Sequence, residues 1–153
     1  WGDVNKPIRA GSFKILSELA KSYLNTRRKV YVVDGYAGWC PEDRIRIRVM
    51  CTRAYHALFM TNMLIKPTAQ ELERDFSDGA DYYIFNAGEF MANKHIPDVV
   101  NETAVSIDFE QRKMVILGTQ YAGEMKKGVF TIMNYLMPKK GHLPLHSSCN
   151  VSK

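Results

Sequence analysis

The sequence predicts an α/β fold in which helices flank a mixed β-sheet, built as a single domain of 153 residues. Short apolar or β-branched runs alternate along the chain with segments of helical periodicity, a pattern typical of helix-covered sheets. One run, residues 45–51, places apolar side chains at every second position, as a half-buried strand does. No repeat, low-complexity tract or linker divides the chain, and its length is that of about one domain.

The first elements are expected to be a helix and a buried strand. Apolar residues recur at spacings of three and four up to Asn25, and Ser12 can cap this helix because its hydroxyl oxygen can accept first-turn amide protons. The β-branched run 30–33 follows as a buried strand. Asp34 and Gly35 are expected to end that strand, and Gly35 permits a turn that other residues resist.

The strand over residues 45–51 has an arginine face. Arg44, Arg46 and Arg48 alternate with its apolar residues. Three arginines on one face could bind an anion. Such residues more often face solvent or pair with acids, and we expect that arrangement here.

Two helices are predicted to follow this strand. The first covers residues 53–63 and contains His56, which we interpret as a packed or hydrogen-bonded residue rather than a ligand. Pro67 ends the segment, and Thr68 then opens a short helix in which Glu71 completes a capping box. Four residues share one side of the first helix: Ala54, Ala57, Leu58 and Thr61.

The middle of the chain is predicted to hold a strand, a long loop and a hairpin. Residues 82–85 are rich in β-forming side chains, whereas residues 87–99 lack apolar periodicity and are expected to form a loop. Residues 103–109 and 113–117 are expected to pair as a hairpin around Glu110 and Gln111.

The composition argues against two classes of function. The net charge is +5, but the lysines and arginines are scattered and do not alternate with aromatic residues, so we expect no nucleic-acid binding. No stretch of about eighteen apolar residues occurs, so we expect no membrane span. Cys40, Cys51 and Cys149 are widely spaced, which fits a reducing compartment such as the cytoplasm better than a disulfide framework.

The last third of the chain carries the side chains that are best suited to catalysis or metal binding. An apolar strand, a turn containing Tyr121 and a helix opening at Gly123 precede an expected strand over residues 143–147 that delivers His146. Lys126 and Lys127 are adjacent near the start of the helix, where the positive end of the dipole and their mutual repulsion disfavour the charged form. A neutral lysine amine can bind a metal ion, so this pair is either a candidate site or two solvated surface lysines.

Four motifs occur along the chain in order: Asp-Gly-Tyr-Ala-Gly-Trp at 34–39, Tyr-His-Ala-Leu-Phe at 55–59, Gly-Thr-Gln-Tyr-Ala-Gly-Glu-Met-Lys-Lys-Gly at 118–128 and Leu-His-Ser-Ser at 145–148. With these motifs the chain resembles the ATP-using phosphoenolpyruvate carboxykinases over nearly its whole length. A long uninterrupted match followed by a correctly spaced histidine is far more specific than a single glycine motif.

The resemblance implies roles for four residues. Lys127 is similar to the lysine ligand of a catalytic Mn²⁺, and His146 to its imidazole ligand, so both would also meet the nucleotide through that ion. Tyr121 resembles the residue that meets the substrate carboxylate or CO₂. Lys126 resembles a partner lysine that contacts phosphate or other negative charge. Lys127, Tyr121 and Lys126 would therefore be catalytic, with Tyr121 and Lys127 also binding substrate.

The resemblance also implies what the protein does. The family converts oxaloacetate and ATP to phosphoenolpyruvate, CO₂ and ADP in gluconeogenesis, using Mn²⁺ together with Mg²⁺ on the ATP. Residues 1–153 would be an incomplete N-terminal, substrate-side domain, because the family pattern continues past Asn150 into a Gly-rich phosphate loop. We therefore expect the nucleotide-binding half to be missing and the fragment to be inactive alone.

Two alternatives remain at this stage. His142, His146 and Cys149 offer N and S ligands that would suit zinc, although Pro144 prevents a regular helix that would align the two histidines, and a fourth ligand is not evident. The chain could also be a non-catalytic binding or interaction module that retains the N-terminal fold.

Overall fold

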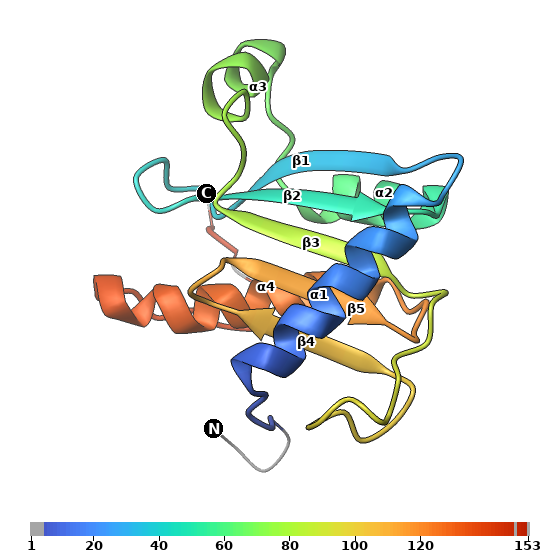
Figure 1. Cartoon of the computed structure of the whole chain (residues 1–153). Coiled ribbons are helices and arrows are strands. Elements are labelled where there is room, and N and C mark those ends of the chain that lie inside the picture. Colours follow the sequence, from blue (N-terminus) through green and yellow to red (C-terminus); the bar gives the residue numbers. More distant parts are fainter. Residues whose placement is uncertain (1–4, 149, 153) are drawn as a thin grey trace.

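The computed structural model describes residues 5–148 and 150–152, and it confirms a mixed five-stranded sheet flanked by helices (Figure 1). The strands lie in the order β1-β2-β3-β5-β4. The elements are α1 (Ala10–Asn25), β1 (Tyr31–Ala37), β2 (Ile45–Cys51), α2 (Ala54–Met63), α3 (Ala69–Asp75), β3 (Tyr82–Ala87), β4 (Ala104–Asp108), β5 (Lys113–Leu117), α4 (Gly123–Leu136) and a 3₁₀ turn η1 (Pro138–Lys140).

The three central strands run in the same direction. β2 pairs in parallel with β3, and β3 with β5, whereas β1 and β4 are antiparallel outer strands. The carboxyl ends of β2, β3 and β5 therefore meet at one edge of the sheet. In open α/β sheets this edge is where ligands usually bind.

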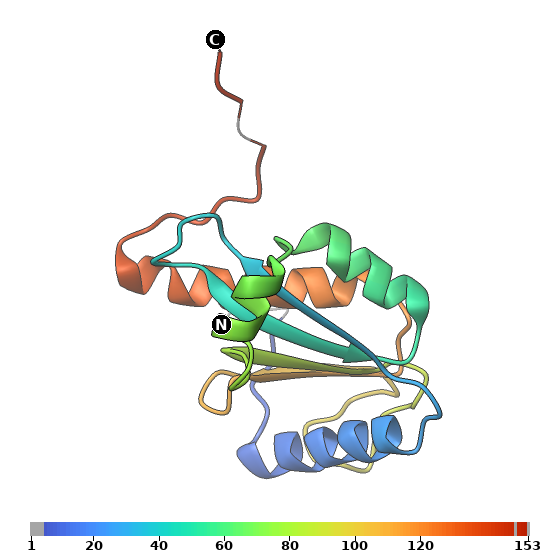
Figure 2. The same ribbon diagram turned by 90° about the horizontal axis from the view of Figure 1, so that it is seen from above.

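Helices cover both faces of the sheet. Figure 2 shows α1 on one face and α2 with α4 on the other. Each face has its own apolar core: Phe13, Leu16 and Ala20 of α1 pack over one side, and Met125 and Ile132 of α4 pack over the other. Within the described residues, no helix is long and apolar enough to cross a membrane.

The start of α1 differs from the expectation. The helix begins at Ala10, and Ser12 is buried inside it and does not cap it. The carboxylate of Asp98, in the distant loop before β4, accepts the backbone N–H of Arg9 at 2.9 Å instead. A stabilising partner so far along the chain leaves no local signal in the sequence.

The first strand is also longer than expected. β1 continues through Asp34 and Gly35 to Ala37, so the predicted turn at Asp34-Gly35 is wrong. A side chain at Gly35 would meet the Leu64 side chain, since an added Cβ would lie 2.6 Å from Leu64 Cβ. Glycine is needed here for close packing within a strand rather than for a bend.

α2 buries a different side from the one suggested by its apolar spacing. Its buried residues are His56 and Met60, whereas Leu58 is 63% exposed. Apolar residues lie on every side of this helix, so its composition could not indicate which side packs on the sheet. The interpretation of His56 as a packed, hydrogen-bonded residue is confirmed.

The arginine face of β2 pairs with acids, as expected. Arg48 makes two hydrogen bonds to the Asp34 carboxylate, at 2.7 and 2.8 Å. Arg46 pairs with Asp81 at 2.9 Å. Arg44 reaches Glu71 and Asp75 of α3, at 3.2 and 3.3 Å respectively. These arginines are therefore engaged in holding the fold together.

α3 depends on this charge network because none of its residues is buried. The predicted capping box between Thr68 and Glu71 is present, and its hydrogen bonds to Thr68, followed by the contact with Arg44, hold the pKa of Glu71 below its usual value. Hydrogen bonds from Arg74 and then from the Tyr36 hydroxyl hold the pKa of Asp75 far below its usual range. For Asp81, burial alone would raise the pKa, but the hydrogen bonds from Arg46 outweigh burial and lower it.

Acidification is expected to destabilise this network. A carboxyl group whose pKa is lower in the folded than in the unfolded chain adds stability above its unfolded pKa, and loses it as the pH falls towards the folded value. The free energy of unfolding should therefore fall below about pH 4, the ordinary range of Asp and Glu. Urea unfolding from pH 7 to pH 3 measures this, with Asp75→Asn as the matched variant. A pH dependence that is unchanged in Asp75→Asn would contradict the role given to Asp75.

Candidate functional site

The turn between β5 and α4 lies at the carboxyl edge of the parallel strands and has a tightly fixed first half. Gly118 adopts a positive φ of 70°, and a Cβ there would lie 1.8 Å from the carbonyl oxygen of Glu102. Its N–H donates to the carbonyl of Phe90 at 2.8 Å, and its carbonyl accepts the Thr103 hydroxyl at 3.0 Å. Only glycine fits this conformation in this space.

The second half of the turn is held by β3 and α2. Gly88, just after β3, lies so close that a Cβ would be 1.9 Å from the Thr119 carbonyl oxygen. The carbonyl oxygen of Gln120 is 2.8 Å from Nε2 of His56, and the Tyr55 hydroxyl donates to the same oxygen. The backbone that leads into α4 is therefore held by Gly88, which follows β3, and by α2, which follows the neighbouring strand β2.

The turn places Tyr121 beside Lys127. The Tyr121 ring folds over Gly123, where a Cβ would lie 2.5 Å from a ring carbon. The Lys127 amine lies 5.0 Å from the centre of this ring and 3.9 Å from a carboxylate oxygen of Glu124. Tyr121 is 59% exposed and the Lys127 side chain 63% exposed, so both are accessible from solvent. Two of the predicted site residues thus lie together on an accessible surface.

Lys126 does not share this arrangement. It is exposed, but adjacent residues on a helix point in different directions. The Lys126 side chain therefore leaves the helix in a different direction from that of Lys127. Gly128, the residue after Lys127, packs against β5, since a Cβ there would lie 2.2 Å from the Met114 sulfur.

His146 reaches α4 by a different route from the one expected. Residues 143–147 form no strand, so that prediction is wrong. Two contacts of His142 hold the start of this irregular segment. The backbone N–H of His142 donates to the Met137 carbonyl at 3.0 Å, and its Nε2 lies 2.9 Å from an Asp43 carboxylate oxygen. The His146 ring then lies 5.2 Å from the Phe130 ring. Phe130 lies three positions after Lys127 and four after Lys126, so His146 packs on a part of α4 that neighbours both lysines.

The donor set is compatible with part of a divalent metal site. The Lys127 amine belongs to α4 and the His146 imidazole packs on Phe130 of the same helix, so both are nitrogen donors at α4, and Glu124 adds a carboxylate beside Lys127. Lys127 must lose its proton to act as a ligand. In the part of the chain that the structure describes, no three His, Cys, Asp or Glu side chains gather as metal ligands. A metal held by Lys127 and His146 would therefore need water or other oxygen ligands to complete its coordination.

The zinc alternative gains no support from the described residues. His142 is paired with Asp43, whereas His146 packs against Phe130, so the two rings have different partners. Its third ligand, Cys149, lies outside the described residues. Of the two described cysteines, Cys51 is buried, which raises the pKa of its thiol to about 11.

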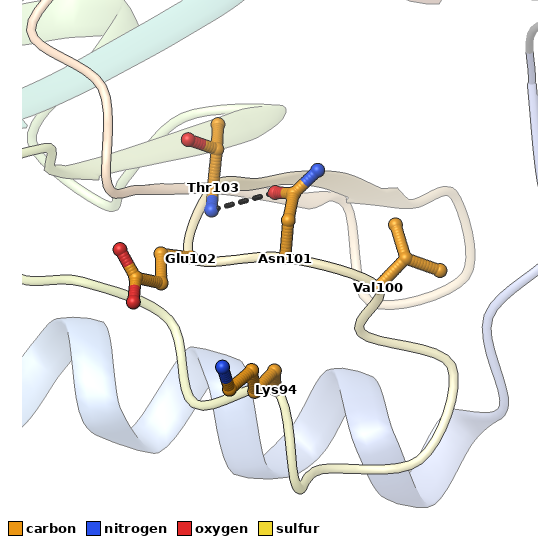
Figure 3. A pocket seen from close by; sticks show the side chains of 5 residues that line it. All are labelled: Lys94, Val100, Asn101, Glu102 and Thr103. Carbon is orange, nitrogen blue, oxygen red and sulfur yellow. Dashed lines mark hydrogen bonds between the residues drawn. The ribbon is translucent and has the colours of Figure 1, made fainter.

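A shallow hollow of about 430 Å³ lies in the loop before β4 and is lined by Lys94, Val100, Asn101, Glu102 and Thr103 (Figure 3). The Asn101 side chain accepts the backbone N–H of Thr103 at 2.8 Å, which shapes the loop. Thr103 in turn supports Gly118, so this loop contributes to the candidate site by fixing its turn.

Sequence reasoning missed the residues that support the turn. Asn86 is 1% exposed at the end of β3, donates towards His56 and accepts the N–H of Gly88. Its signal in the sequence was a polar residue at the end of an apolar strand. Thr103 gave no such signal, because its hydroxyl acts on a residue reached only through the β4–β5 hairpin.

Comparison with known proteins bears on the identity of this chain. A family model described as phosphoenolpyruvate carboxykinase, of the ATP class, matches residues 1–153. The phosphoenolpyruvate carboxykinase (ATP) of Dictyostelium discoideum is 58% identical over 153 residues, covering 100% of this chain and 27% of the relative. That of Saccharomyces cerevisiae is 53% identical over 151 residues, covering 98% and 27%. Phosphoenolpyruvate carboxykinase (ATP) 2 of Salinibacter ruber is 53% identical over 150 residues, covering 98% and 28%.

These matches cover the whole chain but only a limited part of each relative. The chain spans about a quarter of the length of the curated relatives it matches. A match over all of its residues, at more than half identity, shows the family directly. The chain belongs to the ATP-class phosphoenolpyruvate carboxykinase family.

Proposed function

We propose that this chain is the substrate-side part of an enzyme that converts oxaloacetate and ATP to phosphoenolpyruvate, CO₂ and ADP. The observation that carries the proposal is the contact between Tyr121 and Lys127 at the start of α4, which follows β5 at the carboxyl edge of the parallel strands. The packing of His146 on Phe130 of the same helix supports it. Family membership supports the same reaction class.

The proposed roles follow from the chemistry of each side chain. The Tyr121 hydroxyl would donate a hydrogen bond to the substrate carboxylate or to the departing CO₂. Lys126 would offset negative charge on a phosphate or carboxylate. Lys127 and His146 would hold Mn²⁺, with Mg²⁺ accompanying ATP. When bound, the metal would stabilise the charge that develops on the enolate and on the transferring phosphoryl group.

We further propose that the nucleotide is bound mainly by residues outside these 153, which would form a nucleotide-binding half that packs on this substrate-side domain. The support is that the curated relatives are nearly four times as long as the matched region. Lys127 and His146 would touch the nucleotide only through the shared metal ion. A cytoplasmic setting and a place in gluconeogenesis belong to the same proposal, and the unpaired thiols of Cys40 and Cys51 are compatible with that setting.

The 153-residue chain tested by itself is expected to show no carboxykinase turnover. Positioning of the ATP phosphates supplies much of the rate in phosphoryl transfer, and the described residues offer no phosphate-binding loop. The purified chain should be assayed with oxaloacetate, ATP and Mn²⁺, using a full-length relative as the positive control. Formation of phosphoenolpyruvate above background would contradict the expectation.

The chain is expected to bind Mn²⁺ weakly through Lys127 and His146. Replacing either residue with alanine should lower the affinity by more than about tenfold, because changes in the outer shell of a metal site alone often cost that much. Lys126→Ala is the matched control and should bind as the unmodified chain does. Titration followed by the electron paramagnetic resonance of free Mn²⁺ measures all three variants.

The pH dependence of Mn²⁺ binding gives a second readout of the same site. Lysine and histidine must both be unprotonated to act as ligands, so the affinity should rise as the pH rises. Equal affinity in Lys126→Ala and Lys127→Ala, or binding that weakens as the pH rises, would exclude the proposed ligands.

A further inference from the structure

We propose that His56 is a positioning residue that holds the Gln120 carbonyl and thereby sets the turn presenting Tyr121 to Lys127. The consequence of this positioning for catalysis rests on the proposed function, whereas the positioning of the turn by His56 does not. His56 comes from α2 and makes none of the contacts described for Tyr121 and Lys127, so its effect on them would pass through the backbone of the turn.

His56 belongs to a buried chain of hydrogen bonds that links three elements. The N–H of Gly88 donates to Oδ1 of Asn86 at 3.0 Å. Nδ2 of Asn86 lies 3.4 Å from Nδ1 of His56, and Nε2 of His56 lies 2.8 Å from the Gln120 carbonyl oxygen. His56 and Asn86 are only 2% and 1% exposed. The chain thus runs from the end of β3, through α2, to the turn before α4.

The partners fix the direction of every hydrogen bond in this chain. A carbonyl oxygen can only accept, so Nε2 of His56 must carry the proton that faces Gln120. The Asn86 oxygen is already engaged by the N–H of Gly88, so the amide group of Asn86 must donate to Nδ1. The imidazole is therefore the neutral tautomer with hydrogen on Nε2. A second proton on Nδ1 would face the Asn86 amide donor.

The Gln120 carbonyl is a sensitive point in the turn. Gly118 and Gly88 leave no space for the first half of the turn to shift, since added Cβ atoms would lie within 2 Å of backbone oxygens. The peptide that carries the Gln120 carbonyl also carries the N–H of Tyr121, which donates to the Thr119 hydroxyl at 3.2 Å. Rotation of this peptide would therefore move the Tyr121 ring off Gly123 and away from Lys127.

Packing alone does not explain a histidine at this place. Met60, one turn later in α2, is fully buried without a polar partner, so an apolar side chain can serve the core there. Burying an imidazole costs solvation free energy unless both nitrogens are hydrogen-bonded. Both nitrogens of His56 are bonded, and the bond from Nε2 ends on the turn.

Two substitutions separate positioning from packing. In His56→Gln the side-chain amide is as many bonds from the backbone as Nε2, so it can still donate to Gln120. In His56→Asn the amide reaches only as far as Nδ1, so the donor from residue 56 is lost and the Tyr55 hydroxyl alone still donates to the Gln120 carbonyl. Amide hydrogen exchange should then rise about tenfold at Tyr121, Glu124 and Met125 in His56→Asn, the factor expected for one hydrogen bond of ordinary strength, and should be restored in His56→Gln. Exchange within β2 and β3 should stay unchanged in both.

The ¹⁵N spectrum of His56 in the unmodified chain needs no variant. It therefore tests the proposed directions of the His56 hydrogen bonds even if His56→Asn fails to fold. The proposal expects a protonated Nε2 and an unprotonated Nδ1. The reverse tautomer, unchanged exchange at the turn in His56→Asn, or exchange that rises equally across the sheet would each overturn it.

Mn²⁺ titration of the same variants separates this inference from the proposed function. If the metal site is as proposed, His56→Asn should bind Mn²⁺ more weakly than His56→Gln. If the unmodified chain binds no Mn²⁺ at Lys127 and His146, the proposed function fails, and the exchange and ¹⁵N results still decide the role of His56.

Discussion

The Gln120 carbonyl accepts hydrogen bonds that hold the turn carrying Tyr121 into α4, and the candidate site depends on this turn. Donors from α2 fix the carbonyl, and glycines on two neighbouring segments close the space around the turn. The turn sets the start of α4, and with it the contact between Tyr121 and Lys127 and the position of Phe130, on which His146 packs. Parallel strands make this possible, because only they bring the ends of β2, β3 and β5 to one edge.

The charges of the domain are divided between structure and an accessible surface. The net charge is +5, yet the arginines of β2 are bound to acids that hold α3 and the edge of the sheet. Lys127 differs from them because its contact with Glu124, at 3.9 Å, is longer and its side chain is 63% exposed. Lys127 is therefore an accessible cation on α4, whereas the arginines of β2 serve the fold.

Sequence reasoning predicted the fold class, the arginine strand, the capping box and the β4–β5 hairpin because each has a local pattern. It failed where distant segments decide the outcome. Asp34 and Gly35 have the residue types of a turn, but pairing with β2 keeps them in a strand. Asp98 replaces Ser12 at the start of α1. Apolar residues lie on every side of α2, so the elements packed against it decide which side is buried.

The candidate site was predicted in part for similar reasons. Tyr121 and Lys127 are close in sequence, so a turn and one helical turn suffice to bring them together. His146 was expected on a strand beside the start of α4, but it lies on an irregular segment held by contacts with Asp43 and Met137, and its ring packs on Phe130 of that helix. His56 was recognised as a hydrogen-bonded residue, but its partner in the turn could be found only in three dimensions.

Paramagnetic broadening by Mn²⁺ tests most directly whether this side of α4 is a metal-binding surface. At substoichiometric Mn²⁺, amide signals near the bound ion disappear first, so the spectrum locates the ion without a mutation. The expected result is selective loss of signals from residues around Tyr121, Lys127 and His146. Loss centred instead on the acidic groups Asp75, Asp78 and Asp81 near α3, with the α4 signals intact, would contradict the proposed site.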